Sequence, residues 1–158
     1  NLLNGVGKIM EKTNMKNFYL ILMTLCFMGG MFLSANAADM SIDMLNKQGK
    51  EKMLYSVNVA EVDVGDTITW QPKDKGHNVQ FIAGPDGWKL PKKSKMNAVV
   101  EVTFDTPGMY LYQCTPHATM GMIGVVIVGG DVSNKDAIAK VKIRGKSKKK
   151  LKKILKNI

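Results

Sequence analysis

Residues 105–128 read DTPGMYLYQCTPHATMGMIGVVIV, and this stretch decides the fold. On both sides of a central loop, β-branched and aromatic residues predominate, as they do in β-strands. The two-residue period of a strand puts Tyr110, Tyr112 and Cys114 on one face, which we expect to point inward. The stretch therefore predicts two neighbouring strands, joined by a loop that holds a histidine and two methionines.

Similar short segments fill the middle of the chain, separated by turn-forming Gly, Pro and Asp residues. No helical pattern lies between them, which favours an all-β antiparallel sandwich over a parallel α/β sheet. Tyr110 follows Thr106-Pro107-Gly108 and matches the tyrosine corner of Greek-key sandwiches, in which the hydroxyl bonds to nearby backbone. We expect seven strands: Ser41–Leu45, Met53–Val59, Asp66–Gln71, Val79–Ile82, Ala98–Phe104, Met109–Gln113 and Ile123–Val128.

The last part of the chain has a pattern typical of helices. Ser133 can cap a first helix that Gly145 ends, and Ser147 can cap a second, basic helix. An apolar stripe on the second helix is formed by Leu151, Ile154, Leu155 and Ile158. We expect this stripe to dock on the sandwich with the lysines in solvent, rather than to bind a membrane or nucleic acid.

Charge is distributed unevenly along the chain. From Ala38 to Asn134 there are nine lysines and eleven acidic residues, a net charge of −2. From Lys135 onward, ten lysines and Arg144 stand against one acidic residue, a net charge of +10. The basic character of the whole chain is therefore a property of its tail and says nothing about the core. Because no aromatic residues alternate with these lysines, we expect no nucleic-acid partner.

The first 37 residues look like a secretory signal peptide with a few residues upstream of it. A basic region at Met15–Asn17 leads into an apolar stretch from Phe18 to Leu33, and Ala35-Asn36-Ala37 then matches the pattern that signal peptidase accepts. An uncleaved membrane anchor is the alternative, but the apolar stretch is short and contains two glycines. We expect export to the periplasm and three parts, at residues 1–37, 38–130 (sandwich) and 131–158 (helical extension).

After removal of the signal, Cys114 is the only cysteine left. A lone cysteine in an exported protein is buried and inert, paired with another chain, or chemically used. Here His117, Met120 and Met122 follow it, and His77 is the only other histidine. A thiolate, two imidazoles and a weakly bound thioether make up a blue-copper site, which suits electron transfer because it is a compromise between Cu(I) and Cu(II). Such a closed ligand set leaves no position for a substrate, so we do not expect an enzyme.

Each of these residues also has another explanation when taken alone. Cys-x-x-His occurs in zinc sites, although methionine is a poor fourth zinc ligand. A cysteine and a histidine can form a hydrolytic pair, but no third group or glycine elbow is obvious. A single histidine is usually structural, and the methionines could fill the core. Copper explains all four residue types together, because a sandwich brings the two loops to one end.

These motifs resemble those of the pseudoazurins, which are cupredoxins. The resemblance rests on Cys-Thr-Pro-His-x-x-Met-Gly-Met at 114–122, Asp-Lys-Gly-His-Asn-Val at 74–79 and Met-Leu-Asn-Lys at 44–47. It implies a cupredoxin-like Greek-key sandwich with two C-terminal helices and one type 1 copper ion. The implied copper ligands are His77, Cys114, His117 and Met122. Met120 is the rival axial ligand, because the related amicyanins use a methionine at that spacing.

Residues next to the ligands have roles that follow from their chemistry and agree with this family. The backbone N–H of Asn78 can donate to the Cys114 sulfur, whereas Pro116 has no N–H and withholds a second donor, a balance that tunes the potential. Apolar residues around the second histidine of the motif resemble the family's docking patch, and nearby lysines can steer an acidic partner toward it. The expected docking residues are Met53, Pro72, Lys75, Ala118 and Met120.

The resemblance implies a periplasmic one-electron shuttle. Its implied partners are acidic-surfaced redox proteins in transient complexes: a nitrite reductase or another denitrification enzyme as electron acceptor, and c-type cytochromes as donors. Two alternatives remain open. One is a plastocyanin- or amicyanin-like shuttle for another redox partner, and the other is a copper-binding storage or delivery protein, which would need exchangeable metal. We expect no membrane binding once the signal is removed.

Overall fold

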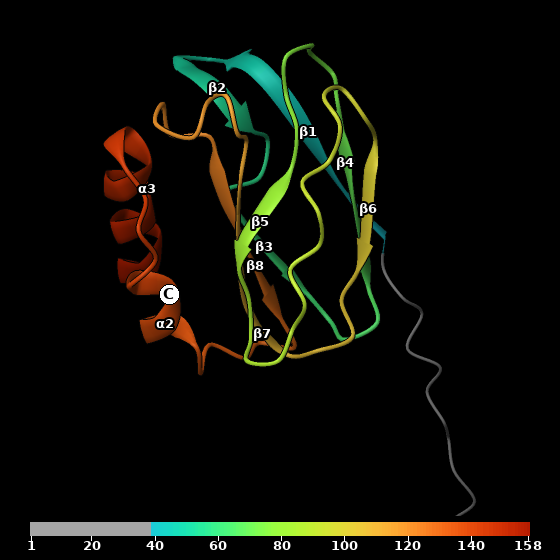
Figure 1. Ribbon diagram of the computed structural model, residues 1–158, viewed down its shortest axis with the longest axis vertical. Helices are drawn as coiled ribbons and strands as arrows, with labels where there is room; N and C mark the ends of the chain where they lie inside the picture. Colours follow the sequence, from blue (N-terminus) through green and yellow to red (C-terminus); the bar gives the residue numbers. More distant parts are fainter. Residues whose placement is uncertain (1–38) are drawn as a thin grey trace, which may run out of the picture. The chain divides into compact units, whose positions relative to one another are not determined.

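The computed structural model describes residues 39–158, which form two β-sheets and two helices (Figure 1). The predicted signal peptide and its cleavage site lie outside the described residues. Among residues 39–158, no helix is both long enough and apolar enough to cross a membrane. The elements are β1 (Asp39–Gln48), β2 (Glu51–Tyr55), β3 (Val59–Val62), β4 (Thr67–Gln71), β5 (Gln80–Ala83), β6 (Val100–Thr103), β7 (Gly108–Gln113), β8 (Ile123–Val128), α2 (Lys135–Ala139) and α3 (Gly145–Lys156).

The strands divide equally between the two sheets. One sheet has the order β2-β1-β4-β6 and the other has the order β3-β8-β7-β5. The predicted sandwich is confirmed, but the expectation of purely antiparallel pairing is wrong, because β1 runs parallel to β4 and β3 runs parallel to β8. Parallel neighbours need a long crossover between them. Here the connecting chain passes through the other sheet, which a pattern of short strands does not reveal.

The predicted strand Met53–Val59 is two strands in the structure. β2 ends at Tyr55 and β3 begins at Val59, and between them the chain passes from one sheet to the other. At this corner the backbone N–H of Asp43 donates to the Ser56 hydroxyl (2.8 Å), and the Ser56 N–H donates to the Asp43 carbonyl (2.8 Å). The sequence does not mark the corner, because the residues on both sides of it suit strands equally well.

The core between the sheets is rich in aromatic rings. Tyr110, Tyr112 and Cys114 are fully buried in one hydrophobic cluster, so the predicted inward face of β7 is confirmed. The Tyr110 hydroxyl donates to the Thr106 carbonyl (2.6 Å), which confirms the tyrosine corner. The ring of Trp70 packs edge-on against that of Tyr112, with centroids 5.1 Å apart. These rings form a rigid base beneath the end of β7, where Cys114 lies.

The two C-terminal helices pack on the sheet that contains β7 and β8, as Figure 1 shows. The predicted apolar stripe of α3 is confirmed, because Leu151, Ile154 and Leu155 are buried in a cluster with side chains of that sheet, Ile123 and Val125 among them. Burial of each large apolar side chain contributes roughly 1.5–3 kcal/mol. The basic tail is therefore a docked part of the fold.

The starts of the two helices differ from the prediction. Ser133 does not cap α2, because Asn134 occupies the N-cap position and its side chain bonds to the backbone of β7. α3 begins at Gly145, earlier than a cap at Ser147 would place it. Ser147 is buried, and its hydroxyl donates to the backbone carbonyl of Ala118. Its role is thus to join α3 to the loop between β7 and β8.

Candidate metal centre

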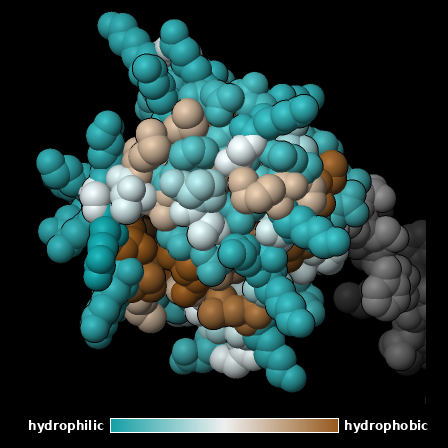
Figure 2. All heavy atoms as spheres, turned by 45° about the horizontal axis from the view of Figure 1, so that its top comes forward, coloured by the Kyte–Doolittle hydropathy of each residue, from teal (hydrophilic) through white to brown (hydrophobic). Residues whose placement is uncertain are grey.

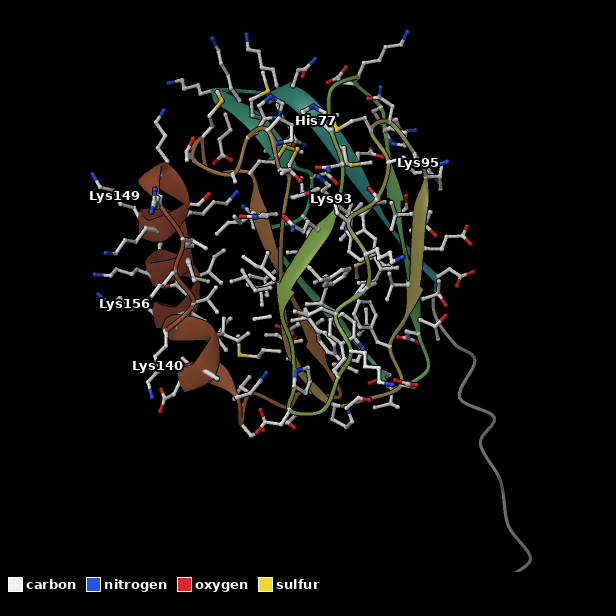
Figure 3. All side chains as sticks on the ribbon, in the orientation of Figure 1. His77, Lys93, Lys95, Lys140, Lys149 and Lys156 are labelled. Atoms are coloured by element: carbon white, nitrogen blue, oxygen red, sulfur yellow. The ribbon has the colours of Figure 1, made fainter. Side chains whose placement is uncertain are left out.

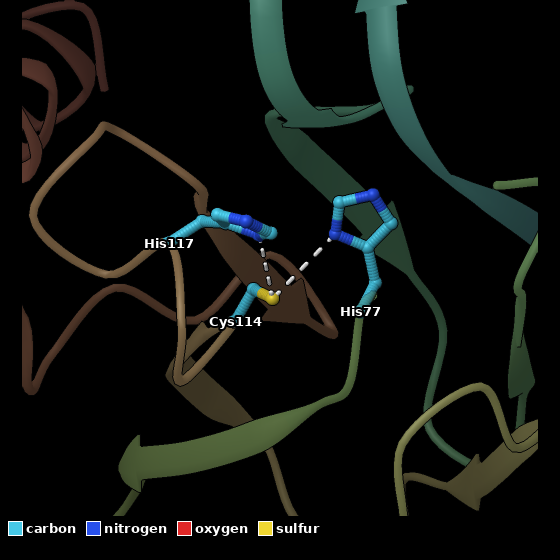
Figure 4. Close-up of side chains that lie close together, drawn as sticks. All are labelled: His77, Cys114 and His117. Carbon is cyan, nitrogen blue, oxygen red and sulfur yellow. Dashed lines mark hydrogen bonds between the residues drawn. The ribbon is translucent and has the colours of Figure 1, made fainter. Parts of the chain in front are cut away.

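Two loops at one end of the sandwich bring three candidate ligands together (Figures 3 and 4). His77 lies in the loop between β4 and β5, Cys114 follows β7 directly, and His117 lies in the loop from β7 to β8. The Sγ atom of Cys114 is 3.7 Å from His77 Nδ1 and 3.5 Å from His117 Nδ1. Both imidazoles therefore turn the same ring nitrogen toward the sulfur, as Figure 4 shows.

The two methionines of the β7–β8 loop have opposite environments. Met122 is fully buried in the same cluster as Cys114, whereas 45% of Met120 is exposed. The backbone N–H of Cys114 donates to the Met122 carbonyl (3.0 Å), and the Met122 N–H donates to the His117 carbonyl (3.4 Å). Met122 is thus tied through its backbone to both candidate ligands of the loop, while Met120 is available at the surface.

Asn46, in β1, orients the His77 ring. Its Oδ1 lies 3.0 Å from His77 Nε2, and an amide oxygen accepts a hydrogen bond only from a protonated ring nitrogen, which leaves the Nδ1 lone pair free for a metal. Asp74 fixes Asn46 in turn, because its carboxylate accepts a hydrogen bond from the Asn46 backbone N–H (2.6 Å). Sequence reasoning gave Asn46 no role in the site, since 31 residues separate it from His77 and no local pattern connects them.

Asn78 joins the two ligand loops. Its side-chain amide donates to Thr115 Oγ1 (2.9 Å), and its Oδ1 accepts from the Thr115 backbone N–H (2.8 Å). The Tyr55 hydroxyl donates to the Asn78 carbonyl (2.8 Å). Because Asn78 is buried, these bonds are protected from water and fix the separation of His77 and Cys114. The sequence predicted only a backbone role for Asn78 and missed Thr115.

Burial and backbone N–H groups set the protonation of the candidate ligands. Burial raises the pKa of the Cys114 thiol, and the backbone N–H groups of Asn78 and His117 lower it in part. Pro116 has no N–H to give, and the backbone N–H of His117 donates to the Cys114 carbonyl (3.2 Å). Burial, and next the neighbouring His117, lower the pKa of His77. At neutral pH the His77 imidazole is therefore neutral, and metal binding has to displace the thiol proton.

The start of α3 holds the outer part of the ligand loop. The backbone N–H of Lys146 donates to the Thr119 carbonyl (2.9 Å), next to the bond between Ser147 and Ala118. Gly145 has a φ of 64°, and a Cβ at this position would collide with the Thr119 carbonyl. Only glycine accepts both conditions without strain. The helical extension is therefore in contact with the loop that carries the candidate ligands.

The predicted docking residues lie mostly in the same two loops. Pro72 and Lys75 belong to the β4–β5 loop and Ala118 and Met120 to the β7–β8 loop, whereas Met53 lies in β2. Lys75 and Met120 are exposed, and the other three are partly exposed. In Figure 2 the end of the domain that carries these loops is turned toward the viewer, and hydrophobic areas lie there among mostly hydrophilic side chains. Lys93 and Lys95, which Figure 3 labels, line a hollow of about 550 Å³ together with Asn78, Thr115 and Pro116.

The chemistry of these donors fits a copper ion. The Nδ1 atoms of both imidazoles and the Cys114 Sγ are within 4.8 Å of one another. Among residues 39–158, no carboxylate joins this cluster. The buried Met122 lies beside it, since its backbone carbonyl accepts a hydrogen bond from the Cys114 N–H. Thiolate, thioether and imidazole donors favour copper, whereas magnesium and calcium prefer oxygen.

A model of the copper-binding proteins of the plastocyanin/azurin family matches residues 42–129. The chain belongs to this family. A putative pseudoazurin of Rhizobium leguminosarum bv. viciae is 40% identical over 121 residues, which cover 75% of this chain and 78% of the relative. Pseudoazurin of Paracoccus pantotrophus is 37% identical over 117 residues, covering 73% and 80%. The structure of pseudoazurin from Hyphomicrobium denitrificans has a TM-score of 0.71 and 31% identity, covering 77% of this chain and 98% of that one.

These comparisons confirm the predicted resemblance and the cupredoxin fold with two C-terminal helices. The protein is a type 1 copper electron-transfer protein with one copper ion, and it exchanges electrons with other redox proteins. The expectation that it is not an enzyme is confirmed as well, since its relatives are electron carriers.

Proposed function

We propose that His77, Cys114, His117 and Met122 hold the copper ion, with Met122 as the axial ligand. The observation that carries the choice between the methionines is the complete burial of Met122 beside Cys114, against the exposure of Met120. An axial thioether bonds weakly to the metal, so the protein has to hold it in place. The backbone bonds of Met122 supply that restraint.

The surroundings keep these ligands in one arrangement. Asn46 fixes the His77 ring, Asn78 ties the two ligand loops together, and the start of α3 supports the outer loop. Bound copper supplies a one-electron couple between Cu(II) and Cu(I). Because the side chains that bind it have little freedom to move, a change of charge at the site causes little rearrangement, which favours fast electron transfer.

Electrons enter and leave beside His117 in this proposal. The His117 ring is partly exposed, whereas His77 is completely buried. Ala118 and the exposed Met120 follow it in the loop and give this surface an apolar character. A partner can approach such a surface closely without desolvating charges, while Lys75 and other lysines at the rim attract an acidic protein. The resulting complex is expected to be weak and short-lived.

We also propose the redox partners and the compartment. The acceptor is a nitrite reductase or another denitrification enzyme, the donors are c-type cytochromes, and the protein works in the periplasm. The pseudoazurin relatives and the export pattern of residues 1–37 support this assignment. In the alternative, a plastocyanin- or amicyanin-like shuttle, a different redox partner would dock on the same surface.

The ligand set is tested by visible absorption after addition of Cu(II) and then ascorbate. An intense band should appear, bleach on reduction and return on reoxidation. Cys114→Ser should abolish the band, because the charge transfer from thiolate to copper disappears. Met120→Leu is the matched control and should keep it. A band that persists without the thiolate would contradict the assignment.

The partner is tested by stopped-flow oxidation of the reduced protein by a copper-containing nitrite reductase. Transfer should be fast and should slow as salt is added, because surface charges steer the encounter. Lys75→Glu should slow it further, and Lys140→Glu, on the distant α2–α3 segment, should not. Slow oxidation by nitrite reductase, together with fast oxidation by a photosynthetic electron acceptor or fast reduction of the oxidised protein by an amine dehydrogenase, would favour the alternative shuttle.

A further inference from the structure

A groove runs along the open edge of the sandwich, between the two sheets and α3. β2 and β3 are edge strands of their sheets, and α3 lies beside them without closing the gap. The groove has a volume of about 810 Å³. Small-molecule sites in proteins usually have roughly 300–1,000 Å³, so this groove is large enough for one ligand.

The floor of the groove is apolar. Leu54 of β2 and Ile154 of α3 are buried at its base, and Met53, Val59 and Met120 line it as well. Methionine side chains are flexible and polarisable, so they adapt to an apolar guest without a fixed shape. The floor therefore suits a flexible hydrocarbon better than a rigid polar molecule.

The rim of the groove is strongly basic. Two glutamates, Glu51 and Glu61, stand against six lysines, which are Lys50, Lys52, Lys146, Lys149, Lys150 and Lys153. Lysine stems cover apolar surface while their ammonium groups stay in water, so the same side chains extend the apolar wall and place positive charge at the mouth. Lys150 is the only one of these six that is partly buried, and this burial lowers its pKa while the nearby Glu51 raises it in part.

We propose that this groove binds a free long-chain carboxylate, with the acyl chain on the apolar floor and the carboxylate at the lysine rim. An anion without a hydrocarbon tail would leave the floor empty, and a neutral lipid would make no use of the net positive charge at the rim. A flat membrane surface would touch the rim but would not fill a concave floor. A single-chain anionic amphiphile satisfies both parts.

The groove also borders the loop between β7 and β8, which carries candidate copper ligands. Met120 and Gly121, which line the groove, lie in the chain between the candidate copper ligands His117 and Met122. The binding site is nevertheless separate from the ligand set, so its existence does not depend on the copper assignment. A bound acyl chain should shift the methyl resonance of Met120 in the reduced, diamagnetic protein and should leave unchanged that of Met96, which lines the other hollow and not this groove.

Calorimetric titration of the copper-loaded protein with monomeric palmitate tests the proposal. Palmitate should bind with one site per chain, and octanoate should bind at least tenfold more weakly because it covers less of the floor. Lys149→Glu with Lys153→Glu should weaken palmitate binding roughly tenfold or more. The matched control is Lys148→Glu with Lys152→Glu, which changes the same helix by the same charge at exposed positions that do not line the groove.

The proposal is overturned if palmitate does not bind, or if octanoate binds as tightly, since charge alone would then explain the affinity. Equal loss in both double variants would overturn the location in the groove. Binding to phosphatidylglycerol vesicles without binding of monomeric palmitate would show a membrane-surface site instead. The proposal is supported if palmitate shifts the Met120 methyl resonance and if only the variant Lys149→Glu with Lys153→Glu loses palmitate affinity.

Discussion

Tyr112→Phe should stabilise the protein, because the Tyr112 hydroxyl is fully buried and, among the described residues, has no hydrogen-bond partner. A buried polar group without a partner costs about 1–3 kcal/mol. Phenylalanine keeps the ring, and with it the edge-on contacts with Trp70 and Tyr55 at 5.1 and 4.8 Å. We therefore expect the free energy of unfolding to rise by about 1 kcal/mol.

Two other tyrosines serve as matched controls for the same chemical change. The Tyr110 hydroxyl donates to the Thr106 carbonyl (2.6 Å), and the Tyr55 hydroxyl donates to the Asn78 carbonyl (2.8 Å). Replacing either by phenylalanine removes a real hydrogen bond and should lower the free energy of unfolding by about 1 kcal/mol or more. The sign of the effect should thus differ between the site without a partner and the two sites with one.

The assay is urea unfolding of the copper-free protein, followed by far-ultraviolet circular dichroism, because bound metal would add its own binding energy to the measured stability. Within residues 39–158, the Trp70 indole N–H is the other buried side-chain group without a hydrogen-bond partner. Burial raises the pKa of Tyr112, and this indole lies near enough to lower it in part. If Tyr112→Phe destabilised the protein as much as Tyr110→Phe, the reasoning would be refuted, since the Tyr112 hydroxyl would then pair with that indole.

Three further predictions concern the site and the core. Met122→Gln should keep copper but lower the reduction potential measured by voltammetry, because an oxygen donor favours Cu(II). Met120→Gln should leave the potential unchanged. The reverse result would make Met120 the axial ligand in place of Met122. Asn46→Leu should weaken copper binding about tenfold in a competition titration, because the imidazole it orients loses its acceptor, and an unchanged affinity would show that Asn46 is dispensable. Burial raises the pKa of Tyr112 above the ordinary value of 10.0, so stability is fully present below that pH and is lost as pH rises, because only the unfolded chain ionises. Urea midpoints should fall above pH 10 and should fall less in Tyr112→Phe.

Much of the fold could be predicted because it depends on local pattern. The two-residue period of β7 predicted its buried face, and the residues before Tyr110 predicted the tyrosine corner. The corner at Ser56 could not be predicted, since the residues around it suit a strand on either side. The parallel pairing of β1 with β4 was also hidden, because it depends on where the connecting chain passes and not on the composition of either strand.

The same division holds for the metal centre. The candidate donors Cys114, His117 and Met122 lie close together in the chain, so their spacing is visible in one motif. The contributions of Asn46 and Thr115 depend on contacts across 31 and 37 residues, which no motif records. The contact of α3 with the β7–β8 loop also joins residues far apart in the chain, since Ser147 bonds to Ala118 across 29 residues.

By itself, the sequence determined the strand pattern, the set of soft and borderline donors and the apolar stripe of α3, because periodicity and donor chemistry belong to the residues themselves. Only the tertiary structure decided that Met122 is buried while Met120 is exposed, which nitrogen of His77 faces the sulfur, and that lysines of α3 line a groove with β2 and β3. These properties arise where distant segments meet, because burial, tautomer and shared surfaces depend on the neighbours that folding supplies.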